Sequence, residues 1–381
     1  MRTVTLLQPG KIVFGEGCAV QCAQDLGALG KKRVFVVSSP PIVRLTEPLA
    51  EALRVGGAVV RVYAEISTEP AVATVEAAMA AARAFEPDAV IGFGGGSAID
   101  VAKVVAALYD GRQEIHDIFG IGQLGARALY MVSLPTTAGT GSEVTPIAIL
   151  LDEQENLKTG IVSPHLVPDA AYVDPRLTIS LPPAVTAATG LDALTHCIEC
   201  YANKYAHPAV DLYALEGIRL IAANLLRAVE HGDDLEARAN MALGSLYGGL
   251  CLAPVNTAAV HALSYPLGSE FHVPHGISNA ILLPHVVRYN LPAAPERYAQ
   301  MGLALGVELG RDDRETAERG VERLFELYGA CDIPARMSEL GVPEDALPRM
   351  AEAAMKVTRL LKNNLRDLTA ADAEAIYRAA F

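Results

Sequence analysis

The amino-acid sequence predicts two domains of different fold class, an α/β domain followed by an all-helical one. Up to residue 182, short runs of β-branched residues alternate with alanine-rich stretches, which is typical of a parallel sheet covered by helices. After residue 182 the strand patterns stop, and stretches rich in Ala, Leu, Glu and Arg continue to residue 381. A chain of 381 residues, 51% of them hydrophobic, can build two separate cores. We therefore expect domains at residues 1–182 and 183–381.

The individual elements follow from local composition. We expect strands at five short stretches rich in Val and other apolar residues, at 33–39, 58–63, 89–93, 129–134 and 170–174. The alanine-rich residues 72–85 predict a helix. In the second half, residues 210–229 and 312–328 have helical composition as well.

Charge and hydropathy restrict the partners and the location. The net charge is -13, and no run of Lys and Arg could follow a phosphate backbone, so nucleic acid is not an expected partner. The N-terminus turns at Pro9-Gly10 before any apolar stretch reaches signal-peptide length, which predicts a cytoplasmic protein. Residues 239–269 carry no charge and are long enough to suggest a membrane span. Because they include two prolines, His261 and several hydroxyl side chains, we expect a buried helix-turn-helix instead.

Six scattered cysteines indicate a reducing compartment. Cys197 and Cys200 form a C-x-x-C pair, a spacing that zinc and redox sites also use. No second pair accompanies them, so we expect both to be small packing residues.

A glycine-rich turn predicts a nucleotide site. Gly94-Gly95-Gly96-Ser97 follows the 89–93 strand and precedes a predicted helix. Glycines let backbone N–H groups approach a pyrophosphate, and Ser97 is expected to cap the helix whose positive end faces the anion. The alternative is a simple glycine turn between strand and helix. The spacing differs from the G-x-G-x-x-G dinucleotide fingerprint.

Two further segments belong to this prediction. Residues 135–146 are dense in hydroxyl side chains and glycine, which indicates either a surface that grips the nucleotide or a solvent-exposed loop. The 34–37 strand ends in Ser38-Ser39-Pro40, where dinucleotide sites often have a carboxylate that binds the ribose and repels a 2′-phosphate. With Ser39 at that position, both NAD and NADP remain possible.

Four side chains predict a divalent metal site. Asp192 and His196 are four residues apart, so a helix places both on one face. His261 follows downstream, and His275 stands between a proline and a glycine, which turn the chain back toward the first pair. Three nitrogens and one oxygen suit Fe²⁺, Zn²⁺, Mn²⁺ or Ni²⁺. The alternative is that these are ordinary polar helix residues.

Four segments in this order, GGGSAIDVAK, LPTTAGTGSEVTP, GLDALTHCIE and HALSYPLGSEFHVPHG, resemble the signature segments of iron-containing (group III) alcohol dehydrogenases. The resemblance implies a dehydroquinate synthase-like fold, with an N-terminal α/β dinucleotide-binding domain and an all-α C-terminal metal-binding domain. It also implies the metal ligands Asp192, His196, His261 and His275. With Ser39, Gly94 and Ser142 from the segments above, the coenzyme residues are then Ser39, Gly94, Gly95, Gly96, Ser97, Asp100, Thr136, Thr137, Thr140, Ser142 and Lys158.

One departure from the family pattern leaves the substrate open. Many members have a histidine four residues after the third ligand, where this sequence has Tyr265. The stretch around Tyr265 resembles hydroxyacid-oxoacid transhydrogenases, whereas residues 38–40 are closer to maleylacetate reductases. Maleylacetate reductases tend to replace the ligand aspartate, so Asp192 implies a metal-dependent enzyme.

The expected function is hydride transfer between NAD or NADP and a small alcohol, aldehyde, hydroxy acid or keto acid. Fe²⁺ is the first expected metal and Zn²⁺ the second, acting as a Lewis acid beside the ligands His261 and His275. Tyr265 and His272 are the candidate proton relays. A homo-oligomer, a dimer, is expected.

Two alternatives stay open. A dehydroquinate synthase-like lyase would need basic residues to hold its substrate, and residues 239–269 offer none. A non-catalytic metal-binding or nucleotide-binding protein is the other.

Overall fold

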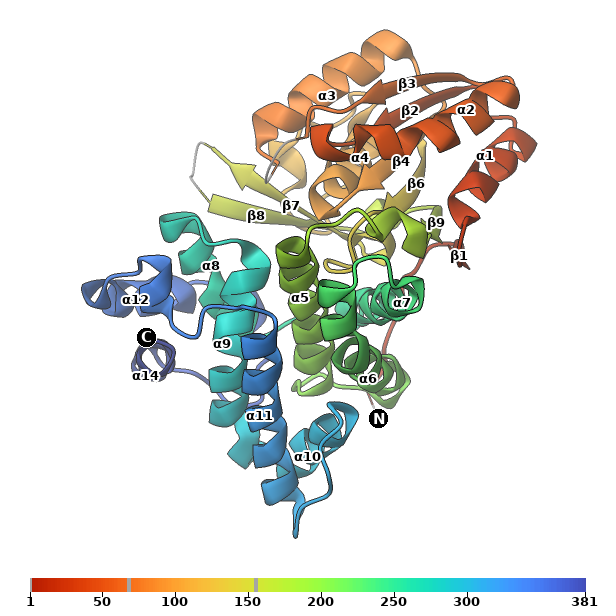
Figure 1. Ribbon diagram of the computed structural model, residues 1–381. Helices are drawn as coiled ribbons and strands as arrows, with labels where there is room; N and C mark the ends of the chain where they lie inside the picture. The colour runs from red at the N-terminus through yellow and green to blue at the C-terminus, as the bar shows by residue number, and fades with distance from the viewer. Residues whose placement is uncertain (1, 67–69, 154–156) are drawn as a thin grey trace. The chain divides into compact units, whose positions relative to one another are not determined.

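The computed structural model describes residues 2–66, 70–153 and 157–381. Its contacts divide the chain into two compact units (Figure 1). One unit is Leu6–Ile179, and the other is Ser180–Phe381 together with the described residues before Leu6. The division after residue 179 lies close to the boundary that the sequence predicts after residue 182.

A parallel six-stranded sheet forms the centre of the first unit, in the order β1-β9-β6-β4-β2-β3. The five expected strands are confirmed, each within two residues of the predicted ends, and β1 is the strand that the sequence did not reveal. The bounds are β1 Lys11–Phe14, β2 Arg33–Val37, β3 Val59–Tyr63, β4 Ala89–Gly94, β6 Tyr130–Pro135 and β9 Ala170–Val173.

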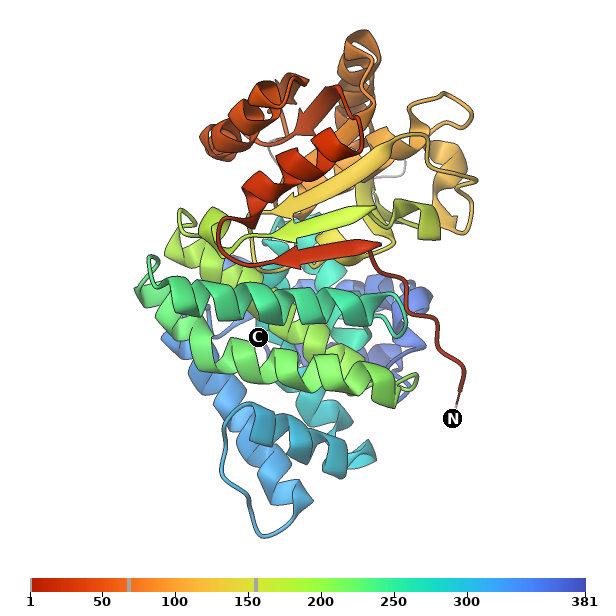
Figure 2. The same ribbon diagram turned by 90° about the vertical axis from the view of Figure 1, so that its right-hand side faces the viewer.

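Helices cover both faces of this sheet, which explains why its strands are apolar along their whole length. Phe35 and Val37 of β2 face α3 (Val72–Phe85) and α4 (Gly96–Leu108), whereas Val34 and Val36 face α1 (Cys18–Ala28) and α2 (Glu47–Val55). Figure 2 shows the sheet with helices on its two sides. Helix α3 has the bounds that its alanine-rich composition predicts.

A small second sheet was not expected from the sequence. It consists of β5 (Gly120–Ile121), β8 (Leu157–Val162) and β7 (Ile147–Asp152), in that order. Strand β7 begins directly after the polar loop at residues 135–146, so the sheet fixes the far end of that loop.

The second unit is helical, as predicted, and its described residues form no strand beyond an isolated bridge between Asn203 and Asn364. The uncharged segment 239–269 is a buried helix-turn-helix, as expected. None of the helices in the described ranges has the length and apolarity that a membrane crossing requires. The bounds are α5 Pro183–Tyr201, α6 Pro208–Glu230, α7 Leu235–Leu252, α8 Ala259–Phe271, α9 His275–Asn290, α10 Pro295–Ala304, α11 Asp313–Ala330, α12 Leu347–Met355, α13 Thr358–Leu361 and α14 Ala370–Ala379.

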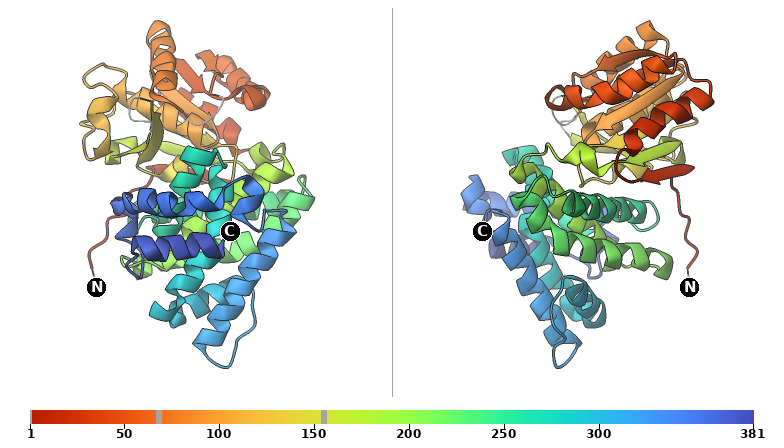
Figure 3. Two further views of the ribbon diagram at one scale, coloured as in Figure 1. Left: turned by 90° about the vertical axis from the view of Figure 1, so that its left-hand side faces the viewer. Right: turned by 45° about the vertical axis from the view of Figure 1, so that its right-hand side comes forward.

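Small residues bring the helices of this unit close together. A Cβ on Gly217 of α6 would lie 2.5 Å from Cys197 Sγ, and a Cβ on Gly244 of α7 would lie 2.6 Å from a side-chain carbon of Ile221. Figure 3 shows α5, α6 and α7 packed side by side, and α10 beside α11. Cys197 and Cys200 are both buried, as expected of packing residues.

Candidate functional site

Helix α5 places Asp192 and His196 on one face, where only 4% and 5% of their surfaces are exposed. The helix begins with Pro183, whose missing N–H is harmless at a first helical position. Glu199 follows His196 by three residues and is buried on the same face. One helix therefore presents three ionisable groups to the same interior region.

The other two candidate ligands come from the next two helices. His261 lies in the first turn of α8, and His275 is the first residue of α9. Between these helices, His272 takes a left-handed conformation with φ 55°, which turns the chain. A Cβ at Gly276 would lie 2.1 Å from the carbonyl oxygen of Ala188, so glycine allows α9 to begin against α5.

The imidazoles of three candidate ligands converge on a single carboxylate oxygen of the fourth, Asp192. Asp192 Oδ1 lies 3.8 Å from His196 Nε2, 3.7 Å from His261 Nε2 and 3.7 Å from His275 Nε2. Ligands bonded tetrahedrally at ~2.1–2.2 Å are about 3.4–3.6 Å apart, close to these distances. The ligand atoms of Asp192, His261 and His275 all lie within 4.8 Å of one another, and the His196 ring stacks on the His261 ring at 4.9 Å. The residues therefore fit a divalent cation.

Charge around the site favours an ionised aspartate. Burial raises the pKa of the Asp192 carboxyl, but the three imidazoles and the Asn279 amide outweigh it and hold the pKa below its usual value. The site is also accessible from one side, because 34% of the His275 side chain is exposed whereas the Asp192 side chain is 5% exposed.

Glu199 contacts one of the ligands, and the sequence prediction missed it. Its Oε2 lies 2.5 Å from His261 Nδ1, and its Oε1 accepts the Val260 N–H at 2.6 Å. A carboxylate at Nδ1 holds the proton there, so the lone pair of Nε2 faces Asp192. The signal was present in the sequence, since residues 192, 196 and 199 share one helical face.

Asn279 is a second group that the sequence prediction missed. It lies one turn after His275 on α9, is 0% exposed, and donates from Nδ2 to Asp192 Oδ1 at 2.8 Å. The four-residue spacing from His275 was again the available signal.

The structure places the two candidate proton relays differently. Tyr265 lies one turn after His261 on α8, and burial raises its pKa, an effect that the nearby Arg359 guanidinium opposes. His272 is exposed at the end of α8, and the structure describes no hydrogen bond between it and the four candidate ligands. The relay itself remains a prediction.

In the first unit, the sheet order marks the expected nucleotide position. Strand β2 is followed by its neighbour β3, and β4 by its neighbour β6 on the opposite side, so the winding direction reverses between β2 and β4. Ligands of open α/β sheets bind beyond the carboxyl ends of the strands at such a point. Ser39 follows β2, and Gly94 is the last residue of β4. Both predicted segments therefore flank the reversal.

The glycine turn leads into α4 as expected, but the predicted cap is wrong. Helix α4 begins at Gly96, the extended residue before it is Gly95, and no side chain caps the first turn. Ser97 thus lies inside the helix. The first N–H groups of α4 remain without helical partners, which leaves them available to an anion.

The second polar loop packs against the glycine turn. Thr136 donates its N–H to Gly94 O at 2.9 Å. A Cβ on Gly95 would lie 3.4 Å from Thr137, and one on Gly96 would lie 2.8 Å from Thr140. The two loops therefore form one continuous surface, and glycine at position 96 is needed for their close approach.

A buried polar cluster fixes this loop to α4. Lys103 Nζ donates to Ser142 Oγ at 2.9 Å and to Ile147 O at 2.8 Å, and Asp100 bonds Ser142. Burial lowers the pKa of Lys103 to about 8 and raises that of Glu143 to about 7. The Asp100 and Ser142 side chains thus bond within the protein, so their coenzyme contact stays a prediction. Lys158 lies on β8, paired with Leu151 of β7.

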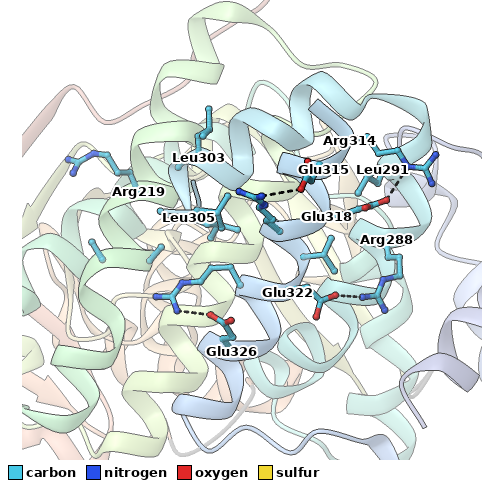
Figure 4. A pocket seen from close by; sticks show the side chains of 18 of the residues that line it. Arg219, Arg288, Leu291, Leu303, Leu305, Arg314, Glu315, Glu318, Glu322 and Glu326 are labelled. Carbon is cyan, nitrogen blue, oxygen red and sulfur yellow. Dashed lines mark hydrogen bonds and ion pairs between the residues drawn. The ribbon is translucent and has the colours of Figure 1, made fainter. Parts of the chain in front are cut away.

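A surface pocket of about 1020 Å³ lies elsewhere in the helical unit (Figure 4). It contains none of the candidate ligands. Its arginines are paired with glutamates, for example Arg288 with Glu322 of α11 at 2.7 Å and Arg323 with Glu326 of α11 at 3.1 Å, whereas Arg219 pairs with Glu216 of α6. These ion pairs offset the positive charge of the pocket.

An open α/β sheet with a glycine-rich loop, and a helical unit with a largely buried cluster of three histidines and one aspartate, are the features expected of a metal-dependent dehydrogenase. Residues 9–175 match the family model "Iron-containing alcohol dehydrogenase", and residues 186–381 match "Fe-containing alcohol dehydrogenase family, C-terminal". The chain belongs to the iron-containing alcohol dehydrogenase family and is an oxidoreductase, as the resemblance implied.

Three relatives illustrate the similarity. Long-chain-alcohol dehydrogenase 1 of Geobacillus thermodenitrificans is 41% identical over 100% of this chain and 98% of its own. The crystal structure of a 1,3-propanediol oxidoreductase covers 100% of both chains, with 35% identity and a TM-score of 0.96. Sulfoacetaldehyde reductase from Bifidobacterium kashiwanohense, solved in complex with NAD⁺, has 29% identity and a TM-score of 0.90 over 100% of this chain and 99% of its own.

Proposed function

We propose that this enzyme transfers hydride between a nicotinamide coenzyme and a small alcohol or aldehyde, with a divalent cation held by Asp192, His196, His261 and His275. The main support is the near-equal distance of three imidazole nitrogens from Asp192 Oδ1. Fe²⁺ is the proposed cation, with Zn²⁺ as the second candidate. When bound, such an ion acts as a Lewis acid that polarises the substrate oxygen.

The protein's own groups prepare this site. Asp192 supplies the single negative charge among the four candidate ligands, so a divalent ion there keeps a net positive charge that attracts an anionic oxygen. Glu199 fixes the tautomer of His261, and the partly exposed His275 marks the side from which substrate enters. Tyr265 and His272 stay the proposed proton relays, since both lie on or at the end of α8.

We propose that NAD or NADP binds beyond the carboxyl ends of β2 and β4. Support comes from the reversal of sheet order there, from the N–H groups at the start of α4, and from the NAD⁺ bound to the sulfoacetaldehyde reductase above. The proposed contacts are Ser39, Gly94, Gly95, Gly96, Ser97, Asp100, Thr136, Thr137, Thr140, Ser142 and Lys158.

The experiment combines metal and coenzyme. Protein freed of metal is reloaded with Fe²⁺ or Zn²⁺ and mixed with NAD⁺ or NADP⁺ and a panel of primary alcohols, and reduced nicotinamide is followed by absorbance. Turnover that requires the cation is expected, together with its loss in Asp192→Asn. Absence of turnover in both directions with both metals would refute the proposal.

An acidic substrate is the second candidate, and Arg359 favours it. This half-buried residue lies on α13, which packs against α8, and it is the one cation among the described charges that act on the Tyr265 hydroxyl. The described residues include no ion pair to its guanidinium. A substrate carboxylate or sulfonate would provide that partner. Arg359→Met should then raise the KM for a hydroxy acid at least tenfold and leave that for propanol unchanged.

We further propose a homodimer and a cytoplasmic location. Six free cysteines support a reducing compartment. Light scattering on the eluted protein measures the mass of the assembly.

A further inference from the structure

The amide of Asn279 stands over the candidate ligands. Its Nδ2 lies 2.8 Å from Asp192 Oδ1, 3.2 Å from His261 Nε2 and 3.1 Å from His275 Nε2. These three atoms belong to the three residues that form the candidate metal group. Asn279 is fully buried, so the contact is part of the packed interior.

The distances define where the amide nitrogen lies. Asp192 Oδ1 is 3.7 Å from each of the two imidazole nitrogens, so the three atoms form a triangle. A point near 3 Å from all three corners lies over the face of this triangle, to one side of its plane. The carboxamide therefore covers one face of the group of candidate ligands.

The chemistry of the amide explains its orientation. Asp192 Oδ1 carries lone pairs, and so does His261 Nε2, because Glu199 holds the proton of that ring at Nδ1. Asn279 Nδ2 has two hydrogens, so it can donate to both atoms at once. The shortest contact is to the Asp192 carboxylate, and a charge-assisted hydrogen bond is the strongest that the amide can make. Asn279 Oδ1 has no hydrogen-bond partner among the described residues. The amide is thus oriented by the ligand triangle alone.

We propose that Asn279 is a positioning residue of the metal site, whose amide holds Asp192 toward the imidazoles and keeps a neutral group over the ligand triangle. The inference rests on the proposed metal site and deepens it. Its consequence is that the identity of residue 279 sets how tightly the cation is held, because a carboxylate here would add a second negative charge beside the candidate ligands.

Two variants have effects of different kinds. Asn279→Ala removes the donor to Asp192, and loss of such an outer partner lowers metal affinity 10–100-fold. Asn279→Asp places a second carboxylate against the first. Without a cation the two charges repel and the protein should melt earlier, whereas with a cation both are attracted and affinity should rise at least tenfold. A purely structural asparagine would not produce opposite shifts.

The test measures cation affinity apart from activity. Zn²⁺ binding is titrated against a chelating indicator, and thermal unfolding is recorded with Zn²⁺ and with excess chelator. Asn290→Asp is the matched control, since Asn290 is a buried asparagine on the same helix that exchanges hydrogen bonds with Asn364 at 2.7 and 2.8 Å. This control should melt earlier in both conditions and bind Zn²⁺ as the wild type does.

The outcomes separate this inference from the proposed function. Asn279→Ala with Zn²⁺ affinity within twofold of wild type would overturn the role of Asn279 and leave the metal site intact, even if Asn279→Asp failed to fold. A wild-type protein that binds no Zn²⁺, or whose Asp192→Asn variant binds it equally well, would overturn the metal site and the inference with it.

Discussion

The carboxylate of Asp192 is buried in a protein interior that would normally disfavour a charge. It is stabilised there by three imidazoles and by the Asn279 amide, each within 3.8 Å of Oδ1. One of these groups, His261, is itself held by the Glu199 carboxylate. Single substitutions should therefore affect metal binding more than they affect the fold.

The first prediction concerns His261→Ala. Loss of the imidazole removes one ligand and leaves the Glu199 carboxylate without its partner, so metal content and turnover should fall together, each at least tenfold. Cys200→Ser is the control, because its Sγ contacts the Asn256 carbonyl at 3.5 Å and none of the ligands. Elemental analysis of both variants gives the answer, and a full complement of metal in His261→Ala would contradict the ligand assignment.

The second prediction concerns Glu199→Gln. The amide keeps the size of the side chain but cannot accept from both His261 Nδ1–H and the Val260 N–H as the carboxylate does. Metal affinity should fall 10–100-fold, and the free energy of unfolding should fall by about 1–3 kcal/mol. The exposed Glu216→Gln, which loses only its pair with Arg219, should cost less than about 1 kcal/mol. Equal effects of the two substitutions on Zn²⁺ affinity would refute the role of Glu199.

Only part of this side-chain arrangement could be predicted from the sequence. Asp192 and His196 were readable because their spacing on one helix fixes a common face. Glu199 and Asn279 have the same spacing signal, but Glu and Asn on helices usually face solvent. Their burial depends on how α8 and α9 pack against α5, which no local pattern contains.

Strands and helices were predictable where their composition was locally decisive. Buried strands such as β4 are apolar throughout, so they stand out from their surroundings. Strand β1 has four partly exposed residues and no such contrast. The prediction that Ser97 caps α4 was wrong because only Gly95 separates the end of β4 from the start of α4. This short connection is possible because Gly94 and Gly96 have no Cβ and can pack closely on Ala98 and Thr140.

The third prediction concerns the start of α9. In Gly276→Ala the new Cβ would lie 2.1 Å from Ala188 O, so α9 must move away from α5 and take His275 with it. We expect a loss of about 1–3 kcal/mol in the free energy of unfolding, as for other overpacked sites, and weaker Zn²⁺ binding. Urea unfolding and indicator titration measure the two effects.

The control for the Gly276→Ala substitution is Gly27→Ala. Gly27 lies in α1, and a Cβ there would meet nothing within 4 Å. Alanine should stabilise that helix by up to about 1 kcal/mol. Unchanged stability and Zn²⁺ affinity in Gly276→Ala would show that the close approach does not constrain α9.

The order of the two units along the chain was predictable because strand and helix periodicities are local properties. The unit to which the first few residues belong was not predictable. Arg2 donates from Nε to Tyr205 O at 3.0 Å and from a terminal nitrogen to Pro254 O at 3.0 Å, which places this segment with the helical unit. Such long-range contacts leave no trace in composition.

The fourth prediction concerns acid stability of the whole molecule. Burial, together with the nearby positive charge of Arg288, lowers the pKa of His285 to about 4, and its ring packs edge-on against Phe325. The unfolded chain therefore binds a proton between pH 6.5 and about 4 that the folded chain does not, so stability is full above pH 6.5 and falls with pH in this window. The loss should reach roughly 2 kcal/mol at pH 5.

Urea unfolding of the chelator-treated protein at pH 7 and pH 5 measures this loss without a contribution from metal release. His285→Gln should flatten the difference between the two pH values. An unchanged pH dependence in that variant would place the acid sensitivity in other groups.

The proposed ligand set of three histidines and one aspartate has a consequence for how the enzyme is purified. Nitrogen and oxygen sites bind Ni²⁺ and Cu²⁺ more tightly than Fe²⁺, following the Irving–Williams order, so the proposed iron occupancy would depend on which ions the cell supplies. Nickel resin would then expose the site to an ion that competes with iron. An affinity tag that needs no metal would preserve it.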